Sequence, residues 1–301
     1  MSENLMQKFL RDRKHLDFAK DYVSYSDEPR QHLAIAHPAI LATFMGYLKF
    51  QLRKTNSEKE VFFRGQSKNY PTIVPSLLRG EDLEKINKLS KACMELKRRT
   101  KELFSAKRFQ NETISNLFQH YGIKSQTLDL VDNLYIAIWF ATNSWEKTQG
   151  FENLCTYKQS KEDFGWIYFM NVEGPRQMNS TEINYDEKFG GYCDLRKYHS
   201  SLSARLHCQH GITYFRDKGK KWTNENREFD DLIIATVKFP NSGEFRMNGT
   251  IFTKEFLFPN SEIDNTYKLL KKLKFTELLR EIEEEYALEK HELGRIWNYN
   301  F

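Results

Sequence analysis

The stretch Val61-Phe62-Phe63-Arg64-Gly65-Gln66-Ser67 decides the fold, because three apolar residues run directly into an arginine, a glycine and an amide. The apolar run is typical of a short buried β-strand. Arg64 carries a planar fork of five donors that suits phosphate or carboxylate, and Gln66 can both donate and accept. Gly65 permits a sharp turn or a close approach of the backbone to a ligand. We expect an interior strand that delivers Arg64 to the rim of a pocket, or else a strand end whose arginine pairs with a structural carboxylate.

The composition is that of a globular protein. The chain has 301 residues, 40% of them hydrophobic and 14% aromatic, which is enough for a substantial core in one large domain or two ordinary ones. A net charge of +5 is too small to indicate nucleic-acid binding by itself. The four cysteines form no Cys-x-x-Cys pair, which favours a reduced, cytoplasmic setting.

No membrane partner is expected. Residues 1–14 are polar and carry both charge signs, unlike a secretory signal. The longest apolar stretches, 33–48 and 134–141, fall short of the roughly 20 residues that cross a bilayer.

Hydrophobic periodicity predicts an α+β (mixed α/β) fold, with a central mixed β-sheet flanked by helices. Helices are expected early, with Leu5, Phe9, Leu16 and Phe18 in the first, then a polar loop over 24–29 and a helix over 39–53. An almost wholly apolar segment, 134–142, predicts a buried helix capped by Asn133. The other expected elements are one or two long helices over 81–118, a loop over 143–163, strands over 166–170, 212–215, 232–239 and 252–258, and a C-terminal helical hairpin over 263–274 and 276–288. We divide the chain into an N-terminal helical region (1–59), a central domain (60–258) and the hairpin (259–301).

The segment 85–108 is strongly basic, with nine Lys and Arg residues against two Glu. One interpretation is a phosphate-facing surface for RNA or DNA. The other is a solvated helix face, which the lack of an accompanying aromatic stacking pattern favours.

Common catalytic and metal-binding patterns are absent from the sequence. There is no phosphate-binding glycine loop and no Gly-x-Ser-x-Gly nucleophile turn. His199, His207, Cys208 and His210 cluster, with Cys193 upstream, but their spacing fits no zinc pattern, so we expect no metal.

A set of polar residues remains, each beside a glycine or at the end of an apolar segment: Arg64, Gln66, His120, Tyr121, Asp129, Arg205 and Gln209. Together they suit an anionic, planar ligand, with arginine for phosphate, tyrosine for stacking, and amides and Asp129 for base or ribose groups. Asp129 is equally suited to be the structural partner of Arg64 or Arg205.

At these residues the sequence resembles the FRG-domain family, a largely bacterial group named for its Phe-Arg-Gly motif. Phe63-Arg64-Gly65-Gln66 matches that motif, and Gln119-His120-Tyr121-Gly122 with Leu128-Asp129 is similar to the second block of the family. A third block, of the form Arg-x-x-x-Gln-x-Gly, is similar to Arg205–Gly211. The family usually has Pro-Thr-Arg-Leu-Leu-Asp in the second block, whereas Lys124–Asp129 lacks that proline and arginine.

An apolar strand that ends in Arg-Gly is also similar to the arginine motif with which some ADP-ribosyltransferases hold NAD. Where those enzymes place a glutamate this chain has Gln209, so either Asp129 or Glu228 would supply the carboxylate or the transferase-like fold would lack the usual chemistry. This likeness implies an NAD- or nucleotide-handling enzyme of bacterial defence or toxin function.

For such an enzyme we predict Arg64, His120, Asp129 and Gln209 as catalytic residues. The residues predicted to bind the cofactor are Arg64, Gly65, Gln66, Tyr121 and Arg205. The partners would be a small-molecule nucleotide and a nucleic-acid or protein acceptor. The alternative is a non-catalytic module that binds a nucleotide or RNA.

Overall fold

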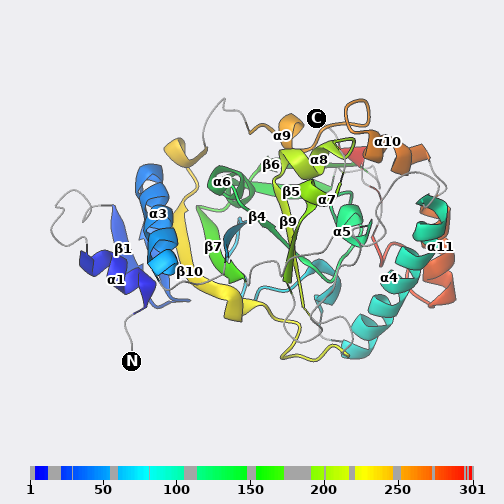
Figure 1. Ribbon diagram of the computed structural model, residues 1–301, viewed down its shortest axis with the longest axis horizontal. Coiled ribbons are helices and arrows are strands. Elements are labelled where there is room, and N and C mark those ends of the chain that lie inside the picture. The colour runs from blue at the N-terminus through cyan, green and yellow to red at the C-terminus, as the bar shows by residue number, and fades with distance from the viewer. Residues whose placement is uncertain are drawn as a thin grey trace.

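The computed structural model describes most of the chain. The described residues are 4–12, 22–28, 30–54, 60–80, 82–104, 114–147, 154–172, 191–199, 201–216, 221–246, 252–272, 275–294, 296 and 298–299. Within them, helices surround a large central sheet and a small second sheet, so the predicted α+β class is confirmed (Figure 1).

The central sheet has eight strands in the order β1-β2-β10-β7-β3-β4-β9-β8. Neighbouring strands are antiparallel except for β2 and β10, which are parallel, so the sheet is mixed as expected. The strands are β1 (Val23–Ser26), β2 (His32–Ile35), β3 (Glu60–Gln66), β4 (Leu128–Val131), β7 (Phe164–Val172), β8 (Gly191–Asp194), β9 (Gly211–Phe215) and β10 (Ile233–Pro240).

The predicted strand at 61–63 is the middle of β3, which lies deep in the sheet between β7 and β4. Side chains alternate across the sheet, as strand geometry requires. Phe63 and Phe169 point to one face, where α1 (Leu5–Asp12), α3 (Pro38–Lys54) and α6 (Leu134–Thr142) pack. On the other face, Phe62 and Tyr168 belong to a separate cluster that includes Ile73 and Phe229 from the connecting loops.

Helix α6 forms where the sequence predicts it. The Asn133 side chain accepts hydrogen bonds from the backbone N–H groups of Tyr135 and Ile136, and most of the helix is buried. The helix packs directly on β3: a Cβ added at Gly65 would lie 1.8 Å from the carbonyl oxygen of Ala137. Helix packing, rather than approach to a ligand, therefore explains why this position is glycine.

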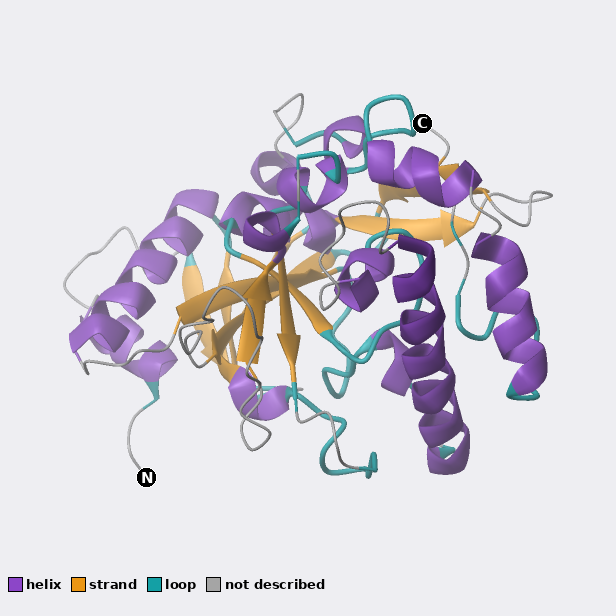
Figure 2. Ribbon diagram, turned by 45° about the vertical axis from the view of Figure 1, so that its right-hand side comes forward, coloured by secondary structure: helices purple, strands orange, loops and turns teal. Residues whose placement is uncertain are grey.

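Most of the remaining helices form a second layer beyond β9 and β8, toward the right of Figure 1, and Figure 2 shows them from another side. They share a separate hydrophobic cluster, with Leu89, Phe118 and Phe275 among its buried members. These helices are α4 (Leu83–Phe104), α5 (Ile114–Gln119), α7 (Leu195–Tyr198), α8 (Ala204–Cys208), α10 (Asn265–Lys272) and α11 (Phe275–Glu285). The short helix α9 (Lys254–Leu257) instead places Leu257 in the cluster of α1, α3 and α6, and short 3-10 turns lie at Ser76–Leu78, Asp230–Leu232 and Gly243–Arg246. The helices α10 and α11 are the predicted C-terminal hairpin.

Two segments that were expected to be loops contain strands. Part of the expected polar loop at 24–29 is strand β1. The expected loop at 143–163 contains β5 (Asn143–Lys147) and β6 (Leu154–Gln159), which form the small sheet with β11 (Asn298–Tyr299).

The expected strand at 252–258 contains instead the short helix α9. The Thr253 side chain caps it by accepting from the Phe256 backbone N–H. Leu16 and Phe18, predicted to extend the first helix, lie outside the described residues. The three-part division of the chain stays a prediction.

Three basic side chains of α4 form ion pairs with neighbouring carboxylates. Arg98 and Arg99 form ion pairs with Glu95 on the same helix, and Arg99 also pairs with Glu285 on α11. Lys85 pairs with Glu292. These contacts fit the interpretation of 85–104 as a solvated and packed helix face.

None of the helices in the described ranges has the length and apolar character needed to pass through a lipid bilayer.

Candidate functional site

The candidate site lies where two central strands separate. The described strands β3 and β4 pair at a single position, Phe63 opposite Val131. Beyond that point Arg64 Nη1 donates a 2.7 Å hydrogen bond to the backbone carbonyl of Asp129 across the opening. A cavity of about 230 Å³ occupies this part of the sheet.

Five of the predicted residues line this cavity together: Arg64, Gly65, His120, Asp129 and Gln209. They come from β3, the turn after α5, β4 and the end of α8, segments separated by up to 145 residues of sequence (209 − 64). The structure therefore brings these distant segments together, whereas the roles of the residues stay predictions.

The hydrogen bonds of Gln209 fix the orientation of the His120 ring. Gln209 Nε2 donates to the backbone carbonyl of Leu257 at 2.7 Å, so its Oε1 faces His120 Nδ1 at 2.8 Å. An amide oxygen only accepts, so Nδ1 must carry a proton. The neutral ring therefore has its lone pair on Nε2.

Besides Arg64 Nε, two buried polar atoms in this site have no hydrogen-bond partner. They are His120 Nε2 and Asp129 Oδ1, which lie 3.9 Å apart, too far for a hydrogen bond with each other. Desolvation raises the pKa of Asp129 above its usual value, against the lowering effects of His120, Arg64 and Gln119. Unpartnered buried groups of this kind call for a functional explanation.

The Arg64 guanidinium is held without a carboxylate partner. It bonds to a backbone carbonyl, its Nε has no partner, and none of the described acidic side chains forms an ion pair with it. Burial, together with the positive charge of Arg79, lowers the pKa of Arg64 to about 10. The interpretation of Arg64 as half of a structural salt bridge with the Asp129 carboxylate is therefore wrong.

An aromatic wall completes the cavity, and the sequence did not predict it. Tyr157 and Phe258 stack with ring centroids 4.5 Å apart, and Phe140 lines the cavity beside them. Tyr157 lies in a segment expected to be a loop, and Phe258 follows a helix in a segment expected to be a strand. Their positions depend on the small sheet and on α9, so local sequence gave no signal for them.

Two predicted cofactor-binding residues do not reach the cavity. Tyr121 is fully buried, and its hydroxyl donates to the carboxylate of Asp264 at 2.8 Å. Arg205 is also fully buried, with its guanidinium over the rings of Tyr121 and Tyr267 and a hydrogen bond from Nη1 to the backbone carbonyl of His120. The structure therefore corrects the prediction: this pair supports the turn that carries His120.

Gln66 and Glu228 also lie outside the cavity. They line an adjoining groove of about 660 Å³, which shares Gly65, Phe140 and Tyr157 with the cavity. Gln66 is therefore placed to contact a ligand in the groove. Of the two acids considered as the source of a carboxylate, Asp129 lines the cavity and Glu228 does not.

The comparison with protein families identifies one segment of the chain. The family model of the FRG domain matches residues 59–150. This segment is an FRG domain. No curated protein and no solved structure matches the chain. The likeness to ADP-ribosyltransferases stays a prediction, as does the third FRG-like block at 205–211.

The FRG domain supplies only part of the site. Arg64, His120, Asp129 and Phe140 lie within the matched residues, while Tyr157, Gln209 and Phe258 come from the rest of the chain. The cavity is therefore completed by segments beyond the family match.

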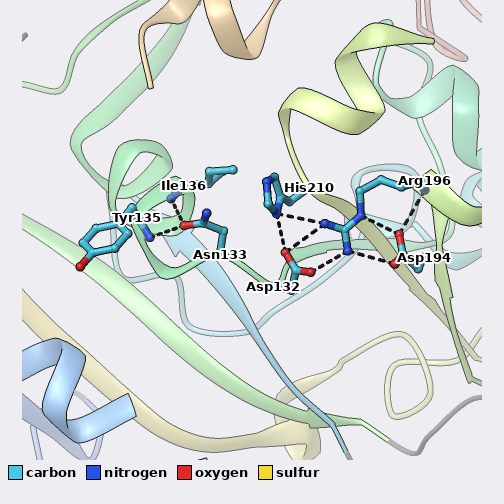
Figure 3. A network of polar contacts seen from close by, with 7 residues as sticks. All are labelled: Asp132, Asn133, Tyr135, Ile136, Asp194, Arg196 and His210. Atoms are coloured by element: carbon cyan, nitrogen blue, oxygen red, sulfur yellow. Dashed lines mark hydrogen bonds and ion pairs between the residues drawn. The ribbon is translucent and has the colours of Figure 1, made fainter. Parts of the chain in front are cut away.

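A network of charged residues holds the FRG domain against these later segments (Figure 3). Arg196 bonds to Asp132 through Nη2 at 2.6 Å and to Asp194 through Nε at 2.8 Å. His210 Nδ1 lies 2.7 Å from Asp132 Oδ1. Because His210 follows Gln209 directly, the network fixes the backbone that positions Gln209 against His120.

The structure also places the residues considered for a metal site. His210 belongs to the network just described, and His199 and Cys193 are buried. Within the described ranges, no group of His, Cys, Asp and Glu side chains is arranged to hold a metal ion.

Asp129→Asn is expected to stabilise the protein at neutral pH. Because the pKa of Asp129 is raised in the folded state, folding favours the protonated carboxyl over the carboxylate. The protonated carboxyl contributes fully to the free energy of unfolding below the unfolded-state pKa of about 3.9, and this contribution is lost as pH rises through the folded-state pKa. Asparagine removes the charge, and its amide can donate to His120 Nε2. The Asp129 side chain is 41% exposed, so water screens its charge and we expect the Tm to rise by only about 1–3 °C at pH 7. The increase should become smaller toward pH 4, and thermal unfolding at both pH values measures it.

Asp132→Asn is the matched control, because desolvation there is outweighed by Arg196 and His210, which hold the pKa of Asp132 below its usual value. This variant should lower the Tm at pH 7. A lower Tm for Asp129→Asn at pH 7 would contradict the assignment of Asp129 as a carboxylate that destabilises the fold.

Proposed function

We propose that the cavity of the FRG domain binds NAD, and that the protein is an ADP-ribosyltransferase-like enzyme that cleaves the bond between nicotinamide and ribose. The observation that carries this proposal is the meeting of unpartnered polar atoms of Arg64, His120 and Asp129 in one aromatic-lined cavity. Perturbed and unsatisfied groups gathered in one pocket are typical of active sites.

The binding groups suit a nucleotide. Arg64 has no carboxylate partner and offers charged donors to a phosphate or a ribose hydroxyl. The rings of Phe140, Tyr157 and Phe258 provide a surface for a planar heterocycle on the other side of the cavity.

In the proposed reaction Asp129 and His120 have separate roles. As the C–N bond to nicotinamide breaks, the bonding electrons leave with the ring nitrogen, and the ribose develops positive charge that the Asp129 carboxylate stabilises. A hydroxyl of water or of an acceptor then bonds to this carbon, and its proton passes to His120 Nε2. Gln209 keeps that lone pair available by accepting from Nδ1.

This assignment differs from the usual transferase arrangement, because Gln209 cannot supply a carboxylate and Asp129 takes that role. NAD consumption would suit the bacterial defence or toxin setting that the family resemblance implies. A module that only binds a nucleotide or RNA remains the alternative. The ion pairs of Lys85, Arg98 and Arg99 reduce the support for RNA binding by α4.

The test is release of nicotinamide from NAD by the purified protein, with water or candidate acceptors. His120→Asn keeps a donor for Gln209 but has no group at the Nε2 position. It should lower kcat about 10²–10⁴-fold while KM and the Tm stay near wild type. His37→Asn is the control, since the His37 ring contacts the Ala39 N–H, Glu244 and Tyr22 and does not line the cavity.

Two outcomes would count against the proposal. Equal turnover by wild type and His120→Asn would remove His120 from the chemistry. NAD binding without release of nicotinamide under any of these conditions would show that the cavity is a non-catalytic binding site.

A further inference from the structure

The groove that adjoins the cavity has the chemistry of a nucleotide site in its own right. Its volume is about 660 Å³, and it is reached from the cavity along a wall formed by Gly65, Phe140 and Tyr157. The cavity itself, at about 230 Å³, is smaller than the roughly 300–1,000 Å³ typical of pockets for drug-sized ligands. A dinucleotide in the cavity would therefore have to continue into the groove.

Two arginines in the groove carry charge that no carboxylate neutralises. Arg79 Nε donates to the backbone carbonyl of Val74 at 3.2 Å, and Arg227 Nη1 donates to the carbonyl of Gly80. Neither forms an ion pair with any acidic side chain of the described chain, in contrast to Arg98 and Arg99 on α4. Positive groups held by backbone carbonyls in this way remain available to an anion.

Arg79 also connects the groove to Arg64. Both arginines line a third hollow of about 210 Å³, together with Lys124 and Asp129, and the charge of Arg79 contributes to the lowered pKa of Arg64. Three basic side chains therefore face one acidic side chain in this hollow. A pyrophosphate is a ligand with enough charge to bridge Arg64 and Arg79.

Aromatic side chains line the same groove. Tyr70 is 48% exposed and Trp145, on β5, is 38% exposed, so part of each ring faces the groove or solvent. Exposed rings beside cations are typical of surfaces on which nucleobases stack. Asn143 and Ser144 add hydrogen-bonding groups for the edge of a base.

We infer that the groove is a second nucleoside-phosphate site, in which Trp145 and Tyr70 contact the base and Arg79 and Arg227 bind the phosphate. This inference rests on the proposed function, because it places the part of NAD that the cavity cannot hold. The same chemistry would accept one nucleotide of a single-stranded nucleic acid that serves as the acceptor.

The first experiment titrates ADP into the wild-type protein by calorimetry. Trp145→Ala and Arg79→Ala should each weaken ADP binding about 10-fold, because each removes a base-stacking or charged contact, with an unchanged Tm. Phe50→Ala and Arg98→Ala, which remove an exposed ring and an exposed guanidinium from α3 and α4, are the matched controls and should leave the affinity unchanged.

Competition against bound ADP shows whether the groove binds part of NAD or one nucleotide of a nucleic acid. Displacement of ADP by NAD, but not by an eight-residue oligouridylate, assigns the groove to the dinucleotide. Displacement by the oligonucleotide, but not by NAD, assigns it to a nucleic-acid acceptor. Both results support the inference.

The inference and the proposed chemistry fail in different ways. ADP binding that depends on Trp145 and Arg79, in a protein that does not consume NAD, supports the second site and removes the enzyme proposal. The inference is overturned if ADP does not bind, or if its affinity is equal in all four variants.

Discussion

Gly65→Ala is expected to lower the free energy of unfolding by more than about 3 kcal/mol, a large part of the roughly 5–15 kcal/mol that stabilises a typical folded protein. The added Cβ would lie 1.8 Å from the Ala137 carbonyl oxygen and 3.0 Å from the Ala141 nitrogen. Both are backbone atoms of α6, so no side-chain rotation relieves the overlap. Relief requires α6 to move off β3, which would open the main hydrophobic cluster. Urea unfolding followed by circular dichroism measures the loss.

Gly46→Ala is the control for this prediction. Gly46 lies inside α3, and a Cβ at that position meets nothing within 4 Å. Alanine there should stabilise the protein by up to about 1 kcal/mol, because glycine is a poor helix former. If Gly65→Ala is insoluble while Gly46→Ala is soluble, that result also supports the packing of α6 on β3. A wild-type unfolding curve for Gly65→Ala would show that α6 does not pack on β3 as described.

Arg205→Ala is the second change with a large expected effect, a loss of at least about 3 kcal/mol. The side chain is fully buried, its guanidinium lies 4.8 Å and 4.1 Å from the ring centroids of Tyr121 and Tyr267, and Nη1 bonds to the His120 carbonyl. Truncation removes these contacts and leaves a cavity. Thermal and urea unfolding of the purified variant measure the effect.

This measurement separates the structural role of Arg205 from the cofactor-binding role that the sequence predicts. Arg98→Ala is the control, because that exposed side chain should contribute less than about 1 kcal/mol. An Arg205→Ala protein with the wild-type Tm and weakened NAD binding would restore the cofactor-binding role.

The elements that sequence predicts well here are those whose burial is nearly complete. The apolar run before Arg64 predicts β3, and Asn133 with the apolar residues after it predicts α6, because few alternatives can bury such segments. By contrast, β1 is polar and partly exposed at the sheet edge, and it forms by pairing with β2. Local sequence carries little signal for a strand of that kind.

Local sequence is also a weak guide to which residues line the candidate site. A polar residue beside a glycine or at the end of an apolar segment has the same local pattern whether it faces a cavity or the interior. Arg64 and Gln209 line the cavity, whereas Tyr121 and Arg205, chosen by the same criterion, are buried against each other. The aromatic residues Tyr157 and Phe258 were missed because their placement depends on tertiary contacts.

The most direct test of the nucleotide site is a crystal structure of the wild-type protein with NAD or ADP-ribose. The account predicts density in the cavity, with a ligand oxygen within about 3 Å of the Arg64 guanidinium and the ribose beside Asp129 and His120. A ligand bound elsewhere, with this cavity empty at saturating concentration, would contradict it.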